Sequence, residues 1–259
     1  MEVNPNWWKR IFDETYLITD ARSVCDDHLT SKEVDFLEKV LKLDRSWPIL
    51  DLCGGQGRHS LELSRRGYQD VTVLDYSKVL INVGKERAEK RGLSTRFIRG
   101  DARETNLPDR CFRIIIVMAS SFGYFVVGEE NEKILLEAYR LLLPGGELLL
   151  DLPDKAHVRD HFVPQSWHEA SEDIVVCRRR TMTDEALICR EMVVSKTQGL
   201  MRDETYRINL YDAESIETIL KSAGFRRVTF EKDVPTHEKR LDYGCMTNRM
   251  VVIAHKPEP

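Results

Sequence analysis

The sequence of 259 residues lacks the cysteine spacing of a metal site or a disulfide framework. Its six cysteines are scattered, without a CxxC or CxH pair, so clustered metal ligands are not expected. We expect reduced thiols that are buried as small apolar side chains. Long apolar runs are also missing, since no stretch approaches the roughly 18 residues of a membrane span.

The first 14 residues, MEVNPNWWKRIFDE, lack the basic start and apolar middle of a secretory signal. We therefore expect a cytoplasmic protein. An excess of positive charge is absent too: 39 Lys and Arg stand against 43 Asp and Glu, a formal net charge of −4. A dedicated nucleic-acid-binding protein is expected to be basic, so nucleic acid is disfavoured as a partner.

What the sequence does contain is enough apolar residues, 42%, to build a sizeable core. From residue 48 apolar strand-like runs alternate with helical patterns, which indicates a parallel sheet covered on both faces. We expect a doubly wound, mostly parallel, seven-stranded α/β sheet. Its predicted strands are 49–52, 71–75, 95–101, 112–119, 147–152, 225–232 and 249–256, and its predicted helices are 58–66, 78–91, 130–143 and 213–223.

Two further parts flank this pattern. The N-terminal part is expected to be helical, with Trp8, Phe12 and Tyr16 on one face and a second helix opening at 30–33. Three strand-like runs at 174–182, 186–196 and 201–211 predict an antiparallel insertion before the last helix. The predicted organisation is a helical cap at 1–44, an α/β core at 45–152, the antiparallel insertion at 153–211 and the rest of the core at 212–259.

Acids and glycines gather where the predicted strands end. Asp51 and the glycines at 54, 55 and 57 close the first strand, Asp75 the second, and Asp101 the third. In an open α/β sheet ligands bind outside the carboxyl ends of the strands. Glycines let the backbone approach a ligand closely, an acid on the second strand can accept from both ribose hydroxyls, and an acid on the third can accept from an exocyclic amine. Together they predict a site for a nucleoside with a polar tail.

The tail is predicted to be an amino acid and not a phosphate. The dinucleotide fingerprint G-x-G-x-x-G lacks its third glycine here, because Ser60 occupies that position. Asp51 would repel a pyrophosphate but could hold an ammonium group. S-adenosylmethionine has a ribose, an adenine amine and an ammonium, and no phosphate.

At these residues the chain resembles the class I S-adenosylmethionine-dependent methyltransferases. The resemblance extends over nearly the whole chain and is closest to a branch of small bacterial and archaeal enzymes with an SFGYF-like stretch after the fourth strand, many of them without an assigned substrate. It is carried by DLCGGQG (51–57), VLD (73–75), GDA (100–102), FRIIIVMASSFGYF (112–125) and LLLPGGELLLD (141–151).

The resemblance implies that Asp51 and the following loop hold the methionine moiety, that Asp75 binds the ribose with Tyr76 packed on the adenine, and that Asp101 and Ala102 face the adenine. Ser120 or Ser121 would lie nearest the methyl sulfonium. The family usually has glycine where this chain has Cys53. The complete expected cofactor set is Asp51, Cys53, Gly54, Gly55, Gly57, Asp75, Tyr76, Asp101, Ala102, Ser120, Tyr16 and Arg22, the last two as candidates for the cofactor's carboxylate or the substrate.

Structural interpretations stand beside these functional ones. Asp75 could initiate a helix and Asp101 could cap a loop. Arg58 and His59 are expected to be structural or solvent-facing. The N-terminal aromatic residues could be core packing or a cover over the cofactor, and the strand that carries Arg178 and Arg180 is expected to present them on a solvated face.

The reaction implied is an in-line methyl transfer to a small molecule through N, O, S or C. Tyr124, His157 and His161 are candidate catalytic assistants, with Tyr124 and His161 preferred. Analogy with the family makes the antiparallel insertion the roof of the substrate pocket, with Tyr206, Asn209 and Tyr211 as lining. The alternatives are an RNA or protein substrate, a binding module that senses the cofactor without turnover and, more remotely, an NAD-dependent oxidoreductase. A monomer or a homodimer fits the sequence equally.

Overall fold

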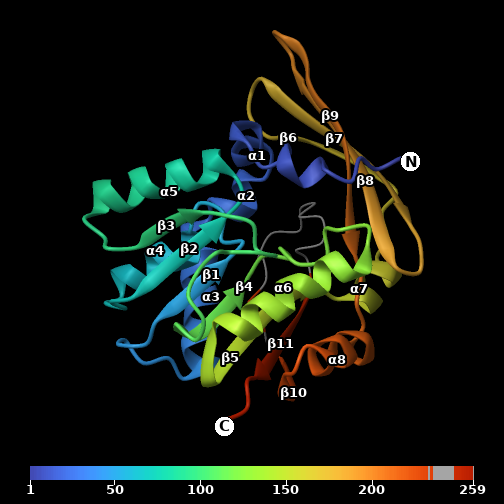
Figure 1. Cartoon of the computed structure of the whole chain (residues 1–259). Helices are drawn as coiled ribbons and strands as arrows, with labels where there is room; N and C mark the ends of the chain where they lie inside the picture. Colours follow the sequence, from blue (N-terminus) through green and yellow to red (C-terminus); the bar gives the residue numbers. More distant parts are fainter. Residues whose placement is uncertain (233, 236–247, 259) are drawn as a thin grey trace.

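The central sheet has seven strands in the order β10-β11-β5-β4-β1-β2-β3, which confirms the predicted fold class (Figure 1). The computed structural model describes residues 1–232, 234–235 and 248–258, and the side chain of Arg22 lies outside the description. All pairings are parallel except those of β11 with β5 and β10. The strands are β1 (Ile49–Leu52), β2 (Val71–Asp75), β3 (Arg96–Arg99), β4 (Phe112–Val117), β5 (Leu142–Pro153), β10 (Arg226–Glu231) and β11 (Arg249–His255).

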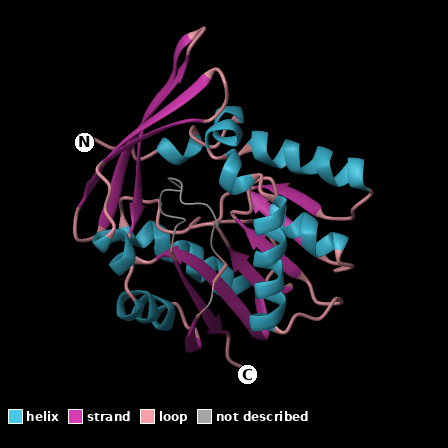
Figure 2. Cartoon of the chain, turned by 180° about the vertical axis from the view of Figure 1, so that it is seen from behind, coloured by secondary structure: helices cyan, strands magenta, loops and turns pink. Residues whose placement is uncertain are grey.

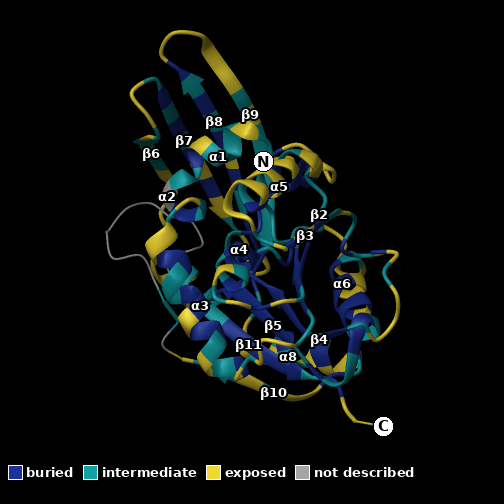
Figure 3. Cartoon of the chain, turned by 90° about the vertical axis from the view of Figure 1, so that its left-hand side faces the viewer, coloured by how far each residue is buried: buried dark blue, intermediate teal, exposed yellow. Residues whose placement is uncertain are grey.

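Helices cover both faces of this sheet (Figure 2). The apolar residues of α3 (Asp27–Leu41), α4 (Arg58–Arg65) and α5 (Lys78–Arg91) pack against one face. Those of α6 (Gly128–Leu141) and α8 (Ala213–Ser222) pack against the other. The inner strands between them, such as β4 and β5, are mostly buried, whereas the edge strand β10 is largely accessible (Figure 3). Because β1 lies between β4 and β2, the chain reverses direction across the sheet there, and a crevice forms outside the strand ends.

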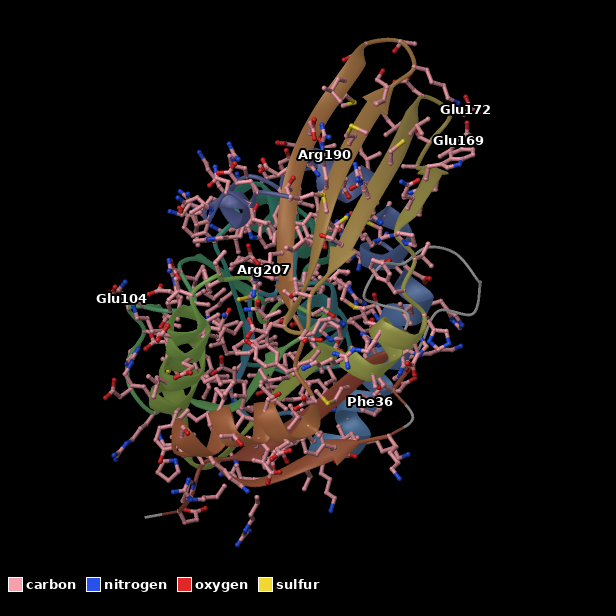
Figure 4. All side chains as sticks on the ribbon, turned by 90° about the vertical axis from the view of Figure 1, so that its right-hand side faces the viewer. Phe36, Glu104, Glu169, Glu172, Arg190 and Arg207 are labelled. Atoms are coloured by element: carbon pink, nitrogen blue, oxygen red, sulfur yellow. The ribbon has the colours of Figure 1, made fainter. Side chains whose placement is uncertain are left out.

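A second, antiparallel sheet stands over one end of the parallel sheet (Figure 1). It follows α7 (Lys155–Asp160) and comprises β6 (Gln165–Glu169), β7 (Ile174–Met182), β8 (Ala186–Ser195) and β9 (Gly199–Asn209), in that order. Figure 4 shows Glu169 and Glu172 at its distant end and Arg207 near the end that adjoins the parallel sheet.

The N-terminal segment lies between the two sheets and is broken into short turns, not one continuous aromatic helix as predicted. It comprises η1 (Trp7–Lys9), α1 (Glu14–Thr19) and α2 (Ala21–Val24). The break has a local cause, because the Asp13 side chain accepts a hydrogen bond from the backbone N–H of Tyr16 and starts a new helix. Ion pairs tie the segment to the antiparallel sheet: Arg10 with Glu204, Asp13 with Arg202 and Asp20 with Arg178.

Other differences from the sequence prediction are local. The second N-terminal helix begins at Asp27, capped by Asp26, and not at residue 30. β5 already begins at Leu142, so the Pro-Gly-Gly segment forms an irregular start of that strand. α7 and β6 were not predicted. The short sequence of α7 has no helical apolar pattern, and that of β6 has no apolar alternation. Cys25 is exposed, which contradicts the expectation that the thiols are buried, and Cys245 lies outside the described residues.

Among the described residues no helix combines the length and apolarity that crossing a membrane requires.

Candidate active site

A glycine-rich loop follows β1 and is shaped around the carboxyl group of Asp51. A Cβ on Gly54 would lie 2.5 Å from the Asp51 carboxyl carbon, so a larger residue there would displace the acid. Gly57 starts α4 with φ of 70°, and a Cβ on it would lie 2.8 Å from the ring of Phe97. Cys53 takes a φ of 61°, a region that favours glycine. The loop therefore needs glycine for close approach at residues 54 and 57.

Asp51 is fully buried and only half paired. Its Oδ2 accepts a hydrogen bond of 2.8 Å from the Ser60 hydroxyl, whereas Oδ1 has no partner among the described residues. Burial raises the pKa of Asp51 to about 7, against the opposing effects of Ser60 and the Arg58 charge. A cation placed next to Oδ1 would stabilise the ionised carboxylate and satisfy this oxygen.

Asp75 ends β2 and links the glycine loop to the start of α5. Its Oδ2 accepts from the backbone N–H of Gly55 at 2.8 Å, and its Oδ1 accepts from that of Ser77 at 2.8 Å. Desolvation raises the pKa of Asp75, while these backbone hydrogen bonds act in the opposite direction. Each carboxylate oxygen keeps a second lone pair for a ligand.

Three adjoining cavities meet at the strand ends, and Phe12 and Tyr124 line all of them. The glycine-loop cavity, of about 80 Å³, is lined by the residues of this loop with Asp75 and Tyr16. The β3-side cavity, of about 60 Å³, is lined by Asp75, Tyr76, Gly100, Asp101 and Ala102. The roof cavity, of about 110 Å³, lies between the N-terminal segment and the antiparallel sheet.

Asp101 lines the β3-side cavity, and both of its carboxylate oxygens accept hydrogen bonds from Arg103. Its Oδ1 accepts from the backbone N–H and Nε of Arg103 at 3.0 Å each, and its Oδ2 accepts from Nη2 at 2.6 Å. Partial burial raises the pKa of Asp101, but the hydrogen bonds from Arg103 outweigh it and lower the pKa overall. The neighbouring Tyr76 packs edge-on against Trp8, with ring centroids 4.7 Å apart.

The roof cavity has an aromatic side and an ion-paired side. Tyr124 stacks on Phe12 at 5.7 Å, and Trp7 lies 5.0 Å from Tyr124. Opposite them are Arg178 and Arg180 of β7, which are 5% and 7% exposed. The expectation that these arginines lie on a solvated face is therefore wrong, because that face of β7 is covered by the N-terminal segment.

Carboxylates neutralise the charge of Arg178 in this wall. Arg178 donates through Nη2 to Asp20 and through Nε to Glu191, each at 2.9 Å, and Arg202 also pairs with Glu191. Tyr206 lines the cavity as predicted, and burial raises its pKa well above the ordinary value. A ligand in this cavity meets paired charges and aromatic rings.

A buried ionic network behind the glycine loop was missed at the sequence level. Glu33 of α3 pairs with Arg58, with His59 Nε2 at 3.0 Å and with Arg249 Nη1 at 2.6 Å. Burial lowers the pKa of His59 to about 4, so its ring is neutral at physiological pH. Arg249 also contacts Asp151 at 2.8 Å. The signal in the sequence was an acid inside the apolar run of β5.

Asp151 fixes the loop after β4, on the border between the glycine-loop and roof cavities. Its Oδ2 accepts from the backbone N–H of Ala119 at 2.8 Å, and its carbonyl accepts from that of Ser120 at 3.1 Å. Ala119 and Ser120 both have positive φ, 56° and 57°. Ser120 lines the roof cavity, whereas Ser121 lines the other two.

Several predicted residues lie elsewhere. His161 is exposed at the end of α7, where its ring stacks on His157 at 4.0 Å, and neither histidine lines the described cavities. His161 therefore lines none of these cavities, and its expected role in catalysis stays a prediction. Asn209 donates to the Phe125 carbonyl, and Tyr211 packs on Phe122, so neither lines the roof cavity as predicted. The side chain of Arg22 lies outside the described residues.

Comparisons with known proteins agree with this geometry. Residues 49–146 match the family model described as a methyltransferase domain. YqeM of Bacillus subtilis (strain 168), named as a candidate methyltransferase, is 25% identical over 89% of this chain and 97% of its own length. Residues 49–146 thus match a methyltransferase domain, and the whole chain has the fold of solved S-adenosylmethionine-dependent methyltransferases.

Solved methyltransferases share the fold over nearly the whole chain. The CcbJ methyltransferase of Streptomyces caelestis has a TM-score of 0.76 at 16% identity and covers 98% of both chains. The sugar N-methyltransferase KedS8 of Streptoalloteichus sp ATCC 53650 has a TM-score of 0.66 at 17% identity and covers 88% of both. The likeness therefore includes the antiparallel sheet and is not confined to the cofactor-binding core.

The residues present fit the cofactor of this methyltransferase family. The unpaired buried oxygen of Asp51 calls for a hydrogen-bond donor, which the cofactor's ammonium supplies. The glycine loop lies against a carboxylate, which would repel the phosphates of a dinucleotide. Asp75 lines two adjoining cavities and so can face a group that extends across both.

Proposed function

We propose that this methyltransferase acts on a small molecule that binds in the roof cavity. The observation that carries the proposal is the position of that cavity, which borders the glycine-loop cavity at Tyr16, Ala119 and Tyr124 and is covered by β7, β8 and β9. This cover is held by ion pairs to the N-terminal segment. A folded protein or an RNA duplex would need an open surface there.

The name of the structural neighbour KedS8 agrees with this class of substrate, since it denotes a sugar N-methyltransferase. In our proposal the paired charges of Arg178, Asp20 and Glu191 favour an acceptor without net charge at the reacting end. An unpaired charge buried against them would lack a partner and would be costly to desolvate.

The proposed cofactor contacts follow the strand ends. Asp51 holds the ammonium through its unpaired Oδ1, and Asp75 accepts from the ribose hydroxyls. Tyr76 and Ala102 pack against the adenine in the β3-side cavity. Asp101 contributes at its rim, where Arg103 already uses both of its oxygens. The bound cofactor supplies an electrophilic methyl group on a sulfonium.

The chain's part in the reaction is alignment and exclusion of water. Tyr124 lies where all three cavities meet, and its ring is fixed by Phe12 and Trp7, so we assign it to orienting the acceptor. Holding the reacting atoms in line can lower the barrier by up to about 7–11 kcal/mol. Tyr16 faces the same border, and burial raises its pKa well above the ordinary value. Its neutral hydroxyl can donate a hydrogen bond but is no base at neutral pH.

The test is to incubate the protein with methyl-labelled cofactor and a cell extract separated into metabolites below about 1 kDa, RNA and protein. We expect the label in the metabolite fraction and its loss with Asp75→Ala. The same extract with Asp184→Asn, a change at a fully exposed side chain, should be labelled normally. Label confined to RNA or protein would contradict the proposal, and cofactor binding without any transfer would favour a non-catalytic sensor.

A further inference from the structure

Three residues that line the glycine-loop cavity each carry a buried polar atom without a hydrogen-bond partner. Such atoms are few among the described residues. Three of them belong to residues that line this one cavity: Asp51 Oδ1, Gln56 Oε1 and Arg58 Nη2. Buried polar groups in folded proteins are nearly always hydrogen-bonded, so unpaired ones call for an explanation. Two acceptors and one cationic donor together match a ligand that has both an ammonium and a carboxylate.

Arg58 is held so that only one of its two terminal nitrogens is used. It is the first residue of α4, and its side chain is 9% exposed. Nη1 pairs with Glu33 and donates to the Thr30 hydroxyl at 2.9 Å, both on α3. Because the guanidinium is planar and rigid, fixing Nη1 also fixes the direction of Nη2. The free donor is thus oriented by the fold before any ligand binds.

The surroundings of Arg58 favour an anion. The N-cap residue of α4, Gly57, provides no side-chain cap, so the helix N-terminus keeps unpaired N–H groups and a partial positive charge. The charge of Arg58 reaches residues across the cavity, where it opposes the rise in pKa that burial causes in Asp51 and Tyr16. An anion beside Arg58 would therefore sit close to the ammonium beside Asp51.

We propose that Nη2 of Arg58 binds the carboxylate of the cofactor's amino-acid end, while Asp51 and Gln56 accept from its ammonium. This inference rests on the proposed orientation of the cofactor. The sequence favoured Tyr16 and Arg22 as the residues that bind this carboxylate. We assign that role instead to Arg58, which the sequence predicted to be structural or solvent-facing. Arg58 then has two roles: Nη1 anchors α3 to α4, and Nη2 selects the zwitterionic tail.

The experiment is calorimetric titration of three ligands without any acceptor present: S-adenosylmethionine, its decarboxylated analogue, and 5′-methylthioadenosine, which lacks the amino-acid end. We expect Arg58→Met to weaken S-adenosylmethionine by about 10–100-fold, the effect of a lost charge-assisted hydrogen bond. The other two ligands should stay within about twofold of the wild type, because neither has a carboxylate. Equal weakening of all three, or of none, would overturn the proposal.

A second variant covers the risk that Arg58→Met unfolds the protein by leaving Glu33 short of a partner. Arg58→Lys keeps a positive charge beside Glu33 but has no second planar donor. It should therefore fold and still lose affinity selectively for S-adenosylmethionine. Arg22→Met is the comparison for the alternative location. A selective loss of S-adenosylmethionine in that variant, with none in Arg58→Lys, would place the carboxylate at Arg22 and contradict our assignment.

These outcomes are separate from the proposed acceptor. Because no acceptor is present, an incorrect small-molecule assignment would leave every affinity unchanged. An incorrect cofactor orientation would show differently: 5′-methylthioadenosine would then fail to respond to Asp75→Ala.

Discussion

Replacing Asp51 by asparagine is expected to stabilise the protein without cofactor while weakening cofactor binding. The carboxyl group is fully buried, and burial raises its pKa from 3.8 to about 7. The unfolded chain releases this proton near pH 4, whereas the folded chain keeps it until about pH 7. Asp51 therefore contributes most to stability below pH 4, and this contribution is lost as the pH rises to about 7.

The magnitude follows from the size of the shift. Each pKa unit corresponds to about 1.4 kcal/mol, so a rise of about three units makes the ionised carboxylate cost up to about 4 kcal/mol. The asparagine side chain of the variant carries no charge and avoids this cost. The difference in unfolding free energy, variant minus wild type, should thus grow by up to about 4 kcal/mol between pH 4 and pH 7, and stay constant above.

The assay is urea unfolding of both proteins at pH 4, 5, 6, 7 and 8 without ligand, with Asp184→Asn as the exposed control. The control difference should not change with pH. Saturating S-adenosylmethionine should reverse the order at pH 8, because only the wild type gains the full stabilisation by ligand binding. A difference for Asp51→Asn that is flat or falls with pH would refute the reasoning.

Three further substitutions test separate contacts. Asp75→Ala should weaken calorimetric binding of S-adenosylmethionine by about 1.5–3 kcal/mol, the range for hydrogen bonds to a charged group, and unchanged affinity would count against the ribose role. Gly54→Ala places a Cβ 2.5 Å from the Asp51 carboxyl carbon. It should lower the free energy of unfolding by about 1–3 kcal/mol and also weaken cofactor binding. A normal melting temperature and normal binding would disprove the close contact. Arg178→Met leaves Asp20 without its buried partner and should lower the free energy of unfolding by about 3–5 kcal/mol. The control is Arg179→Met at the exposed neighbouring residue, which should stay within about 0.5 kcal/mol of the wild type. Similar losses in both variants would show that burial is not the cause.

The parallel sheet could be predicted because its strands are short, continuous apolar runs followed by helices that end at glycine. β1 and β2 were located to the residue, and so was β7 in the insertion, which begins with the apolar run IVVC. β6 was missed because its sequence, QSWHE, is polar except for Trp167, which is 71% exposed. A strand stabilised mainly by pairing with its neighbour leaves little trace in local composition.

The acids at the strand ends could also be predicted, because each follows directly on a strand that the sequence already located. Glu33 as a partner of Arg58 and Asp20 as a partner of Arg178 could not, because they are 25 and 158 residues away in sequence. Local pattern placed Arg178 on a solvated face and left Arg58 as structural or solvent-facing, whereas tertiary contacts bury both against carboxylates. His161 was expected near the mouth of the site; it is exposed at the end of α7 and lines none of the described cavities, so its catalytic role stays a prediction.

The most direct test of the account is a crystal structure of the protein with S-adenosylhomocysteine. We predict the ribose hydroxyls on Asp75, the amino group on Oδ1 of Asp51 and the carboxylate on Arg58. A ligand that lies in the glycine-loop cavity with its sugar turned away from Asp75, or a crevice that stays empty at saturating concentration, would contradict the central claim.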